Sequence, residues 1–445
     1  PIATYRARGD RITFVAELTR RWCALRHTPP EDRKVALVLA NYPNRDGRLA
    51  NGVGLDTPAS TVEALRLLAA EGYSVENAPA TSDALMQAIL AGPTNWLTDR
   101  AEKAGGVALA LATYLEHFNA LPWEVKQRIT DRWGAPEADP FIVAEDPAHS
   151  DPATSSAGGP GGSCRPPEGP SDSRGPAFKL SVLTYGNVVI GLQPARGYNI
   201  DPTETYHSPD LVPPHNYIAF YIWLRETFGA QAIVHMGKHG NLEWLPGKAL
   251  ALSETCLPEA VLGPMPHVYP FIVNDPGEGT QAKRRAQAVI VDHLTPPLTR
   301  AESYGPMRDL EALVDEYYEA AGVDPRRIGL LRKEILGLTA ATGLDRDAGL
   351  TGQDIETDLA KLDAFLCELK EAQIRDGLHV FGHSPTGQLE RDLLQALTRI
   401  PRGDGRGADA SLPRALAADL SLAFDPLDCD LSAPWPGPRP EALAA

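Results

Sequence analysis

One segment of the sequence combines the end of a buried strand with an unusual density of reactive side chains. The run Ala232-Ile-Val is short and apolar, as expected for a strand covered on both faces. His235, His239 and Glu243 follow at four-residue intervals. The glycines among them favour a tightly folded loop over one rigid helix. Because open α/β sheets bind ligands at the carboxyl ends of their strands, we predict a functional site here.

The remaining pattern predicts an α/β fold with mostly parallel sheets flanked by helices, followed by a helical region. Residues 34–40 form a continuous apolar run typical of a buried strand, and Asp56-Thr-Pro then begins a capped helix that ends at about Glu71. Further strands are expected at 178–184, 187–193, 231–235 and 268–273. Further helices are expected at 12–25, 82–91, 103–120, 122–133, 216–228 and 280–293.

Changes in composition suggest a multi-domain chain. Residues 147–176 are dominated by Pro, Gly, Ser and Asp and are expected to be a flexible linker or insertion. The other expected parts are the end of a preceding domain or a linking helix (1–30), an α/β domain (31–146), a second α/β domain carrying the site (177–300), a helical region (301–400) and a polar tail rich in Pro and Gly (401–445). Since the chain begins at Pro1 without Met, we expect a portion of a longer polypeptide.

Charge and cysteine usage exclude several classes of protein. The 445-residue chain has a formal net charge of −16, which disfavours nucleic acid as a partner. It contains no apolar run of the about 18–20 residues that cross a membrane, so no membrane partner is expected. Its five cysteines are scattered and include no Cys-x-x-Cys, which argues against a disulfide framework and fits the cytoplasm.

The three residues of the opening segment suit metal or proton chemistry. His235, His239 and Glu243 can ligate Co, Ni, Zn or Fe, or accept protons. The alternatives are a structural loop and an unrelated metallohydrolase, although the spacing is not the His-Glu-x-x-His of metalloproteases. The sequence has neither a phosphate-binding P-loop nor a Gly-x-Ser-x-Gly elbow, so we expect no ATP hydrolysis by a P-loop mechanism in this chain.

A second group of residues suits the binding of an anionic, flat ligand. Arg196 follows a predicted strand and can hold a carboxylate with two hydrogen bonds. The basic cluster 283–285 is expected in the first turns of a helix, where an anion is favoured. Ordinary turns, solvated charges and core packing are the alternatives. The candidate substrate-binding residues are Gln193, Arg196, Tyr198, Asp201, Lys238, Trp244, Lys283, Arg284 and Arg285.

Several of these motifs together resemble a known family. The segment from His235 to Lys248, Gly54-Leu-Asp-Thr-Pro-Ala-Ser60, Leu257-Pro-Glu-Ala-Val-Leu-Gly-Pro-Met-Pro-His267, Asn274-Asp-Pro-Gly-Glu-Gly279 and Ala282-Lys-Arg-Arg285 look like the large subunit of aerobic cobaltochelatase, the CobN family. They are also similar to the related large subunit of magnesium chelatase. The match covers most of the chain outside 147–176, and the cobalt enzyme is the closer one.

This resemblance implies a specific reaction. The family inserts Co²⁺, a substrate, into hydrogenobyrinic acid a,c-diamide during cobalamin biosynthesis, and separate AAA+ ATPase subunits use the ATP and Mg²⁺. It therefore implies an ATP-dependent cobaltochelatase large subunit that is inactive without its partners. The alternatives are a magnesium chelatase subunit that inserts Mg²⁺ into protoporphyrin IX and a truncated, non-catalytic tetrapyrrole-binding protein.

Overall fold

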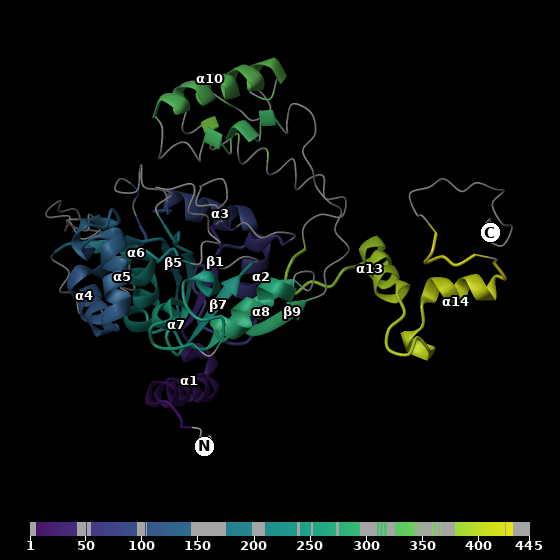
Figure 1. Cartoon of the computed structure of the whole chain (residues 1–445), viewed down its shortest axis with the longest axis horizontal. Helices are drawn as coiled ribbons and strands as arrows, with labels where there is room; N and C mark the ends of the chain where they lie inside the picture. Colours follow the sequence, from purple (N-terminus) through teal and green to yellow (C-terminus); the bar gives the residue numbers. More distant parts are fainter. Residues whose placement is uncertain are drawn as a thin grey trace, which may run out of the picture.

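The computed structural model describes residues 6–41, 50, 55–95, 103, 105–143, 175–197, 210–237, 241–250, 252–272, 276–293, 325–342, 379–422 and 424–429, together with a few positions between 309 and 366. This part of the chain folds around a mostly parallel β-sheet flanked by helices, which confirms the predicted α/β class (Figure 1). None of the helices within these ranges is long and apolar enough to cross a membrane.

Six strands form the main sheet, in the order β5-β6-β1-β7-β8-β9. Neighbouring strands run parallel, except that β5 and β6 form an antiparallel pair. Four of the strands coincide with predicted ones, while the range 178–184 contains two short strands, β4 (Ala177–Leu180) and β5. The strands of this sheet are β1 (Val35–Leu39), β5 (Val182–Tyr185), β6 (Val188–Leu192), β7 (Ala232–Met236), β8 (His267–Ile272) and β9 (Val289–His293).

The first strand lies in the middle of this sheet. β1 pairs with β6 on one side and with β7 on the other, and all five of its residues are buried. The chain thus passes to one side of β1 and then returns across it, and such a reversal opens a crevice at the carboxyl ends of the strands. The ranges 31–146 and 177–300, which composition divides into two domains, contribute to one sheet.

Helix α2 (Thr57–Ala70) follows β1 and begins as the sequence predicts. The Asp56 carboxylate accepts a hydrogen bond of 2.8 Å from the backbone N–H of Ala59, which caps the helix. Glu71 forms its C-cap, and the next residue, Gly72, has a φ of +86° that favours glycine. The expected helices at 12–25, 82–91 and 122–133 are also confirmed, as α1 (Gly9–His27), α3 (Ser82–Ala91) and α5 (Trp123–Trp133).

Two helix predictions are wrong in part. The range 280–293 contains the end of α8 (Pro276–Arg285) and then β9, whose Val-Ile-Val segment pairs with β8. The range 103–120 contains β2 (Val107–Ala110) before α4 (Leu111–Ala120). No turn residue separates β2 from α4 in the sequence, and pairing with β4 (Ala177–Leu180) decides its conformation. β2, β4 and β3 (Ile142–Val143) form a small antiparallel sheet.

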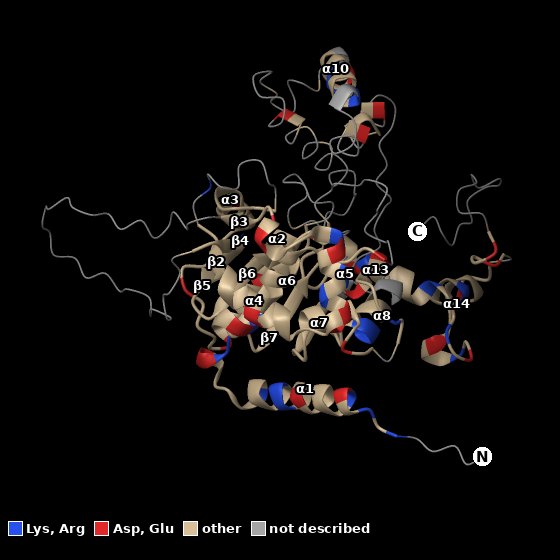
Figure 2. Ribbon diagram, turned by 60° about the vertical axis from the view of Figure 1, so that its left-hand side comes forward, with Lys and Arg blue, Asp and Glu red and all other residues tan. Residues whose placement is uncertain are grey.

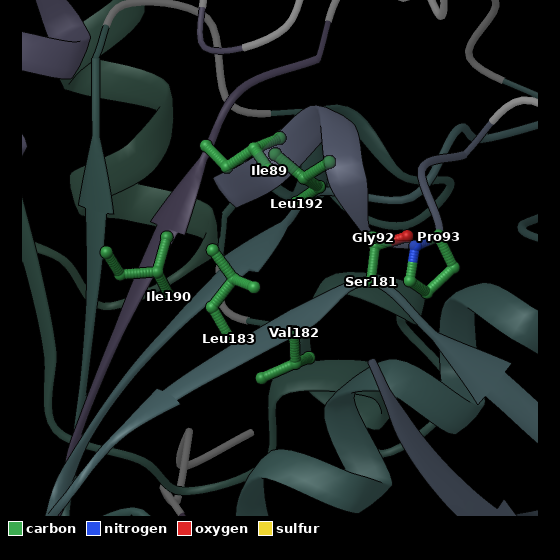
Figure 3. A pocket seen from close by; sticks show the side chains of 8 residues that line it. All are labelled: Ile89, Gly92, Pro93, Ser181, Val182, Leu183, Ile190 and Leu192. Atoms are coloured by element: carbon green, nitrogen blue, oxygen red, sulfur yellow. The ribbon is translucent and has the colours of Figure 1, made fainter. Parts of the chain in front are cut away.

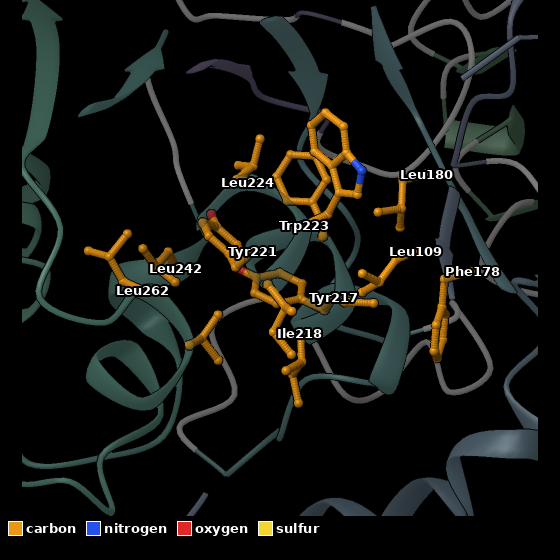
Figure 4. Close-up of a cluster of buried hydrophobic side chains, with 14 of the residues drawn as sticks. Leu109, Phe178, Leu180, Tyr217, Ile218, Tyr221, Trp223, Leu224, Leu242 and Leu262 are labelled. Carbon is orange, nitrogen blue, oxygen red and sulfur yellow. The ribbon is translucent and has the colours of Figure 1, made fainter. Parts of the chain in front are cut away.

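Helix α6 (His215–Ile222) is the centre of the largest core cluster. All eight of its residues are buried, and the helix continues as a π-helical turn, Trp223–Thr227. It ends at Gly229, whose φ is +74°, which confirms the helix predicted at 216–228. Figure 4 shows Tyr217, Tyr221 and Trp223 of this segment among leucines from several elements, including Leu262 of α7 (Leu257–Leu262) and Leu242 of the loop after β7. Aromatic side chains therefore fill the space beneath the main sheet.

The C-terminal part of the described chain is helical. α10 (Pro325–Thr342), α13 (Gln388–Arg399) and α14 (Leu412–Asp419) are its long elements, and α14 lies in the range expected to be a polar tail. Within the expected helical region, Leu310, Val314 and Tyr317 share a buried cluster with Leu359 and Leu362. The range 147–176, expected to be a linker, lies outside the described residues except for 175 and 176.

A glycine in β6 provides a test of core packing. A Cβ on Gly191 would lie 2.6 Å from Cζ of Phe220 on α6, so Gly191→Ala forces this ring to move. We expect it to lower the free energy of unfolding by roughly 1–3 kcal/mol, as overpacking does. Gly329→Ala in α10 is the control, since its Cβ meets nothing within 4 Å and should stabilise the helix slightly. Urea unfolding of both variants measures the difference, and equal stabilities would contradict the packing argument.

Candidate active site

His235 is buried near the carboxyl end of β7, with 3% of its surface exposed. Its Nε2 lies 3.0 Å from the Tyr221 hydroxyl, and its Nδ1 lies 2.9 Å from Nε2 of His267. Both ring nitrogens are therefore engaged by protein groups. As a metal ligand, His235 would have to give up one of these two hydrogen bonds.

The hydrogen bonds continue from Tyr221 towards the end of β6. Its hydroxyl donates to the side-chain oxygen of Gln193 over 2.9 Å, and the Gln193 amide donates to the Tyr217 hydroxyl over 2.8 Å. Tyr217 then donates to the side chain of Asn241 over 2.6 Å. Gln193, one of the predicted substrate-binding residues, is buried and joins β6 to α6 and to the loop after β7.

His267 is the first residue of β8 and is fully buried. Its Nδ1 lies 2.9 Å from the carbonyl oxygen of Ala286, so this nitrogen carries the proton in that bond. Burial lowers the pKa of His267 to about 4, against the opposing effect of the carbonyl. Burial, and then the neighbouring His267, hold the pKa of His235 well below its usual value. Burial thus favours the neutral form of both imidazoles.

Glu243 lies in a short 3₁₀ turn, Leu242–Trp244, and none of its surface is exposed. One carboxylate oxygen accepts a hydrogen bond of 3.2 Å from the hydroxyl of Tyr269 on β8. The Tyr269 ring also lies against His235, with 5.9 Å between ring centroids. Glu243 and His235 are therefore brought to the same part of the core, as the sequence predicts from their spacing. Trp244, next to Glu243, is half-buried.

The basic cluster 283–285 divides into two parts. It occupies the last turn of α8, so the prediction that it lies in the first turns of a helix is wrong, and the helix dipole disfavours an anion there. Lys283 and Arg284 are exposed. Arg285 is buried and donates to three backbone carbonyls, those of Glu243, Leu245 and Lys248. This guanidinium holds the loop that carries Glu243.

Arg196 is also buried, with 1% exposed, and donates a hydrogen bond of 3.2 Å to the carbonyl of Leu211. It lies just beyond β6, as the sequence predicts. The other predicted site residues, Tyr198, Asp201, Lys238 and His239, lie outside the described residues. Among the residues that the structure describes, no group of three or more His, Cys, Asp or Glu side chains is arranged to hold a metal ion.

A small hollow elsewhere in the fold does not offer an alternative site. It lies between α3, the β5–β6 hairpin and Pro93, and apolar side chains such as Ile89, Leu183 and Leu192 dominate its lining (Figure 3). None of its lining residues is ionisable. Exposed helices such as α1 carry interspersed basic and acidic residues (Figure 2).

Comparison with known proteins identifies the family. A family model described as CobN/Magnesium Chelatase matches residues 1–439. The chain is 56% identical to the aerobic cobaltochelatase subunit CobN of a Sinorhizobium species over 98% of this chain and 33% of that protein. It is 52% identical to the CobN subunit of Pseudomonas aeruginosa, over 99% of this chain and 33% of that one. The chain belongs to the CobN/magnesium chelatase family.

A solved structure agrees with this assignment. The catalytic subunit of cobaltochelatase from Mycobacterium tuberculosis matches with a TM-score of 0.62 and 39% sequence identity, over 95% of this chain and 33% of that chain. The chain therefore shares the fold of a CobN relative, and it spans about a third of the length of the curated relatives it matches.

Four buried residues of this CobN-family site were not predicted from the sequence. They are Tyr217, Tyr221, His267 and Tyr269, which contact the predicted residues through hydrogen bonds or ring edges. Tyr217 and Tyr221 are four residues apart and thus share one face of α6. That spacing was a usable signal, whereas the approach of His267 to His235 depends on the pairing of β8 with β7.

The role of Arg285 can be tested directly. Arg285→Lys keeps the charge but cannot donate to three carbonyls in the same fixed geometry, so the 241–250 loop should open more often. Amide hydrogen exchange in this loop should rise at least several-fold, since each lost hydrogen bond is worth about 1 kcal/mol. Arg284→Lys, at an exposed neighbour, should change nothing. Equal exchange in the two variants would show that Arg285 does not hold the loop.

Proposed function

We propose that this chain is the tetrapyrrole-binding part of an ATP-dependent cobaltochelatase large subunit, which inserts Co²⁺ into hydrogenobyrinic acid a,c-diamide in cobalamin biosynthesis. The observation that carries the proposal is a fully buried carboxylate, Glu243, beside a buried histidine in a chain that is 56% identical to a CobN subunit. Burial of a carboxylate is costly, so its position at the carboxyl edge of the sheet supports a chemical role.

Inserting a metal ion into a tetrapyrrole requires two operations at one place. The ring N–H proton of the corrin must leave, and the cation must lose water, so a base and a temporary metal ligand are both useful. Glu243 and His239 are proposed to handle the cation. His235, whose ring nitrogens face Tyr221 and His267, is assigned to the protons instead of the cation.

The substrate carries several carboxylates, which gives the basic side chains near the site a purpose. Arg196, Lys238, Lys283 and Arg284 are proposed to hold these groups, with Gln193 and Asp201 as polar contacts. Tyr198 and Trp244 are proposed to stack on the flat ring system. Arg285 is left out of this group, since it already donates to three backbone carbonyls of the loop.

Cobalt is favoured over magnesium as the inserted ion. Imidazole is a good ligand for Co²⁺, whereas Mg²⁺ prefers oxygen ligands, so the His239–Glu243 pair fits the cobalt reaction better. Insertion of Mg²⁺ into protoporphyrin IX remains the second candidate, because the family model covers both enzymes.

The main test compares two buried glutamates. Glu243→Gln removes the charge at the proposed site and should lower the rate of Co²⁺ insertion at least tenfold, with little change in tetrapyrrole affinity. Glu259→Gln is the control, because this buried carboxylate is paired with Arg11 on α1. The assay contains the chain, the AAA+ partner subunits, ATP and hydrogenobyrinic acid a,c-diamide, with fluorescence quenching as the measure of binding. An insertion rate near wild type for Glu243→Gln would refute the role of Glu243.

ATP hydrolysis is proposed to belong to the partner subunits, which would drive opening and closing of the site. We expect the purified chain alone to hydrolyse no ATP, because its sequence contains no P-loop. The measurement is phosphate release across the fractions of a final purification column. Activity that follows the protein peak would contradict the division of labour.

A further inference from the structure

A continuous chain of hydrogen bonds crosses the core between two backbone carbonyl groups. From the Pro194 carbonyl to the Ala286 carbonyl it passes through Asn241, Tyr217, Gln193, Tyr221, His235 and His267. Its seven links measure between 2.6 and 3.3 Å. Each of the six side chains is at least 94% buried, so water has little access to them.

This chain of hydrogen bonds has one donated proton fewer than it has links. Each of the six side chains, when neutral, supplies one donating group and one accepting group. The carbonyl oxygens at both ends only accept. Six donors must therefore serve seven links, and turning either amide moves the gap without closing it.

In the observed arrangement the gap falls at His235. Tyr221 donates its only proton to Gln193, and His267 donates its Nδ1 proton to Ala286. His235 thus faces an accepting atom on both sides, and a neutral imidazole can donate to only one of them. An imidazolium, which has two N–H groups, fills both links.

A second buried pair shows that this shortfall is not a general property of a tyrosine beside a histidine. The Tyr114 hydroxyl lies 2.7 Å from Nδ1 of His215, whose Nε2 lies 3.1 Å from the carbonyl oxygen of Gly134. Tyr114 donates to the imidazole, which donates to the carbonyl, so two protons serve two links. This pair is complete when both groups are neutral.

We propose that the chain from Asn241 to His267 holds one proton during metal insertion, with His235 as the imidazolium. When a pyrrole N–H bond breaks, its electron pair stays on the nitrogen and forms the bond to the cation, while the proton is taken up by the chain. The proton returns to solvent before the next turnover. Tyr221, Gln193 and His267 are positioning residues that set accepting atoms around His235. Only the source of the proton rests on the proposed function.

The groups around His235 have opposing effects on its protonation. Burial and His267 disfavour the imidazolium, and the neighbour on β1, Val38, is apolar. The Glu243 carboxylate lies close enough to raise the pKa of Tyr221, and its negative charge favours the imidazolium. Tyr217 and Tyr269 add neutral hydroxyls, and the charge of Arg196, which acts on Tyr217, opposes proton uptake. Burial sets the net direction and holds the pKa of His235 below its usual value, so the hydrogen-bonded chain gains a proton as the pH falls.

The experiment follows this proton in the whole 445-residue protein, without substrate. Ring ¹⁵N chemical shifts of labelled histidines report tautomer and charge as a function of pH. Tyr221→Phe divides the chain of hydrogen bonds into two parts, and in each part the donors and links are equal in number. His235 then loses the Tyr221 oxygen as its second acceptor. We expect proton uptake by His235 to shift about one to two pH units lower in this variant, as for loss of a hydrogen bond to a charged group.

Tyr114→Phe is the matched control, because it removes a buried hydroxyl from the complete pair and should leave the titration of His235 unchanged. Tyr217→Phe cuts the chain at another link and should reproduce the shift, also if Tyr221→Phe fails to fold. An unchanged titration in the cut chains would overturn the proposal. The expected shift in a protein that inserts no cobalt would support the proton-holding chain and reject the proposed function.

Discussion

The parallel pairing of β1 with both β6 and β7 is the constraint on which the site depends. It aligns Val35 with Val188 on one side and with Ala232 on the other. The carboxyl ends of all three strands consequently meet at one edge. Gln193, whose backbone N–H donates to the carbonyl of Leu39, and His235 are 42 residues apart in the sequence but separated in space only by Tyr221.

Complete burial explains why the polar residues at this edge are organised as a connected chain. The strands around them are covered on both faces, so a polar group there finds little water. An unpaired buried donor or acceptor costs about 1–3 kcal/mol, which selects side chains that satisfy one another. Amide, hydroxyl and imidazole groups each carry a donor and an acceptor, and a chain of them can cross an apolar core. Its one incomplete link then becomes the place where an added proton is stabilised.

The sequence predicts the local elements well and the contacts between distant segments poorly. The apolar run at 34–40 and the Asp56 cap carry their own signals, as do His235 and Glu243, which lie eight residues apart at and just beyond the end of a predicted strand. β9 was expected to be helical, because its Val-Ile-Val segment is short and only pairing with β8 fixes it as a strand. The roles of His267 and Arg285 depend on how β8 and α8 pack against the loop after β7, which no local pattern contains.

The two sides of the site are held by different physical means, and the proposed chemistry needs both. The proton side consists of neutral groups fixed by hydrogen bonds inside the core, where burial keeps His235 uncharged until a proton is offered. The cation side is a loop that contains the short 3₁₀ turn Leu242–Trp244, and the Arg285 guanidinium fixes this loop at three carbonyls. The permanent positive charge of Arg285 thus lies beside the backbone that carries the buried Glu243 carboxylate, the negative group proposed to hold the cation. In the proposed reaction the cation is held on the Glu243 side and the proton on the His235 side, so the two positive charges are carried by separate elements, each with its own polar partners.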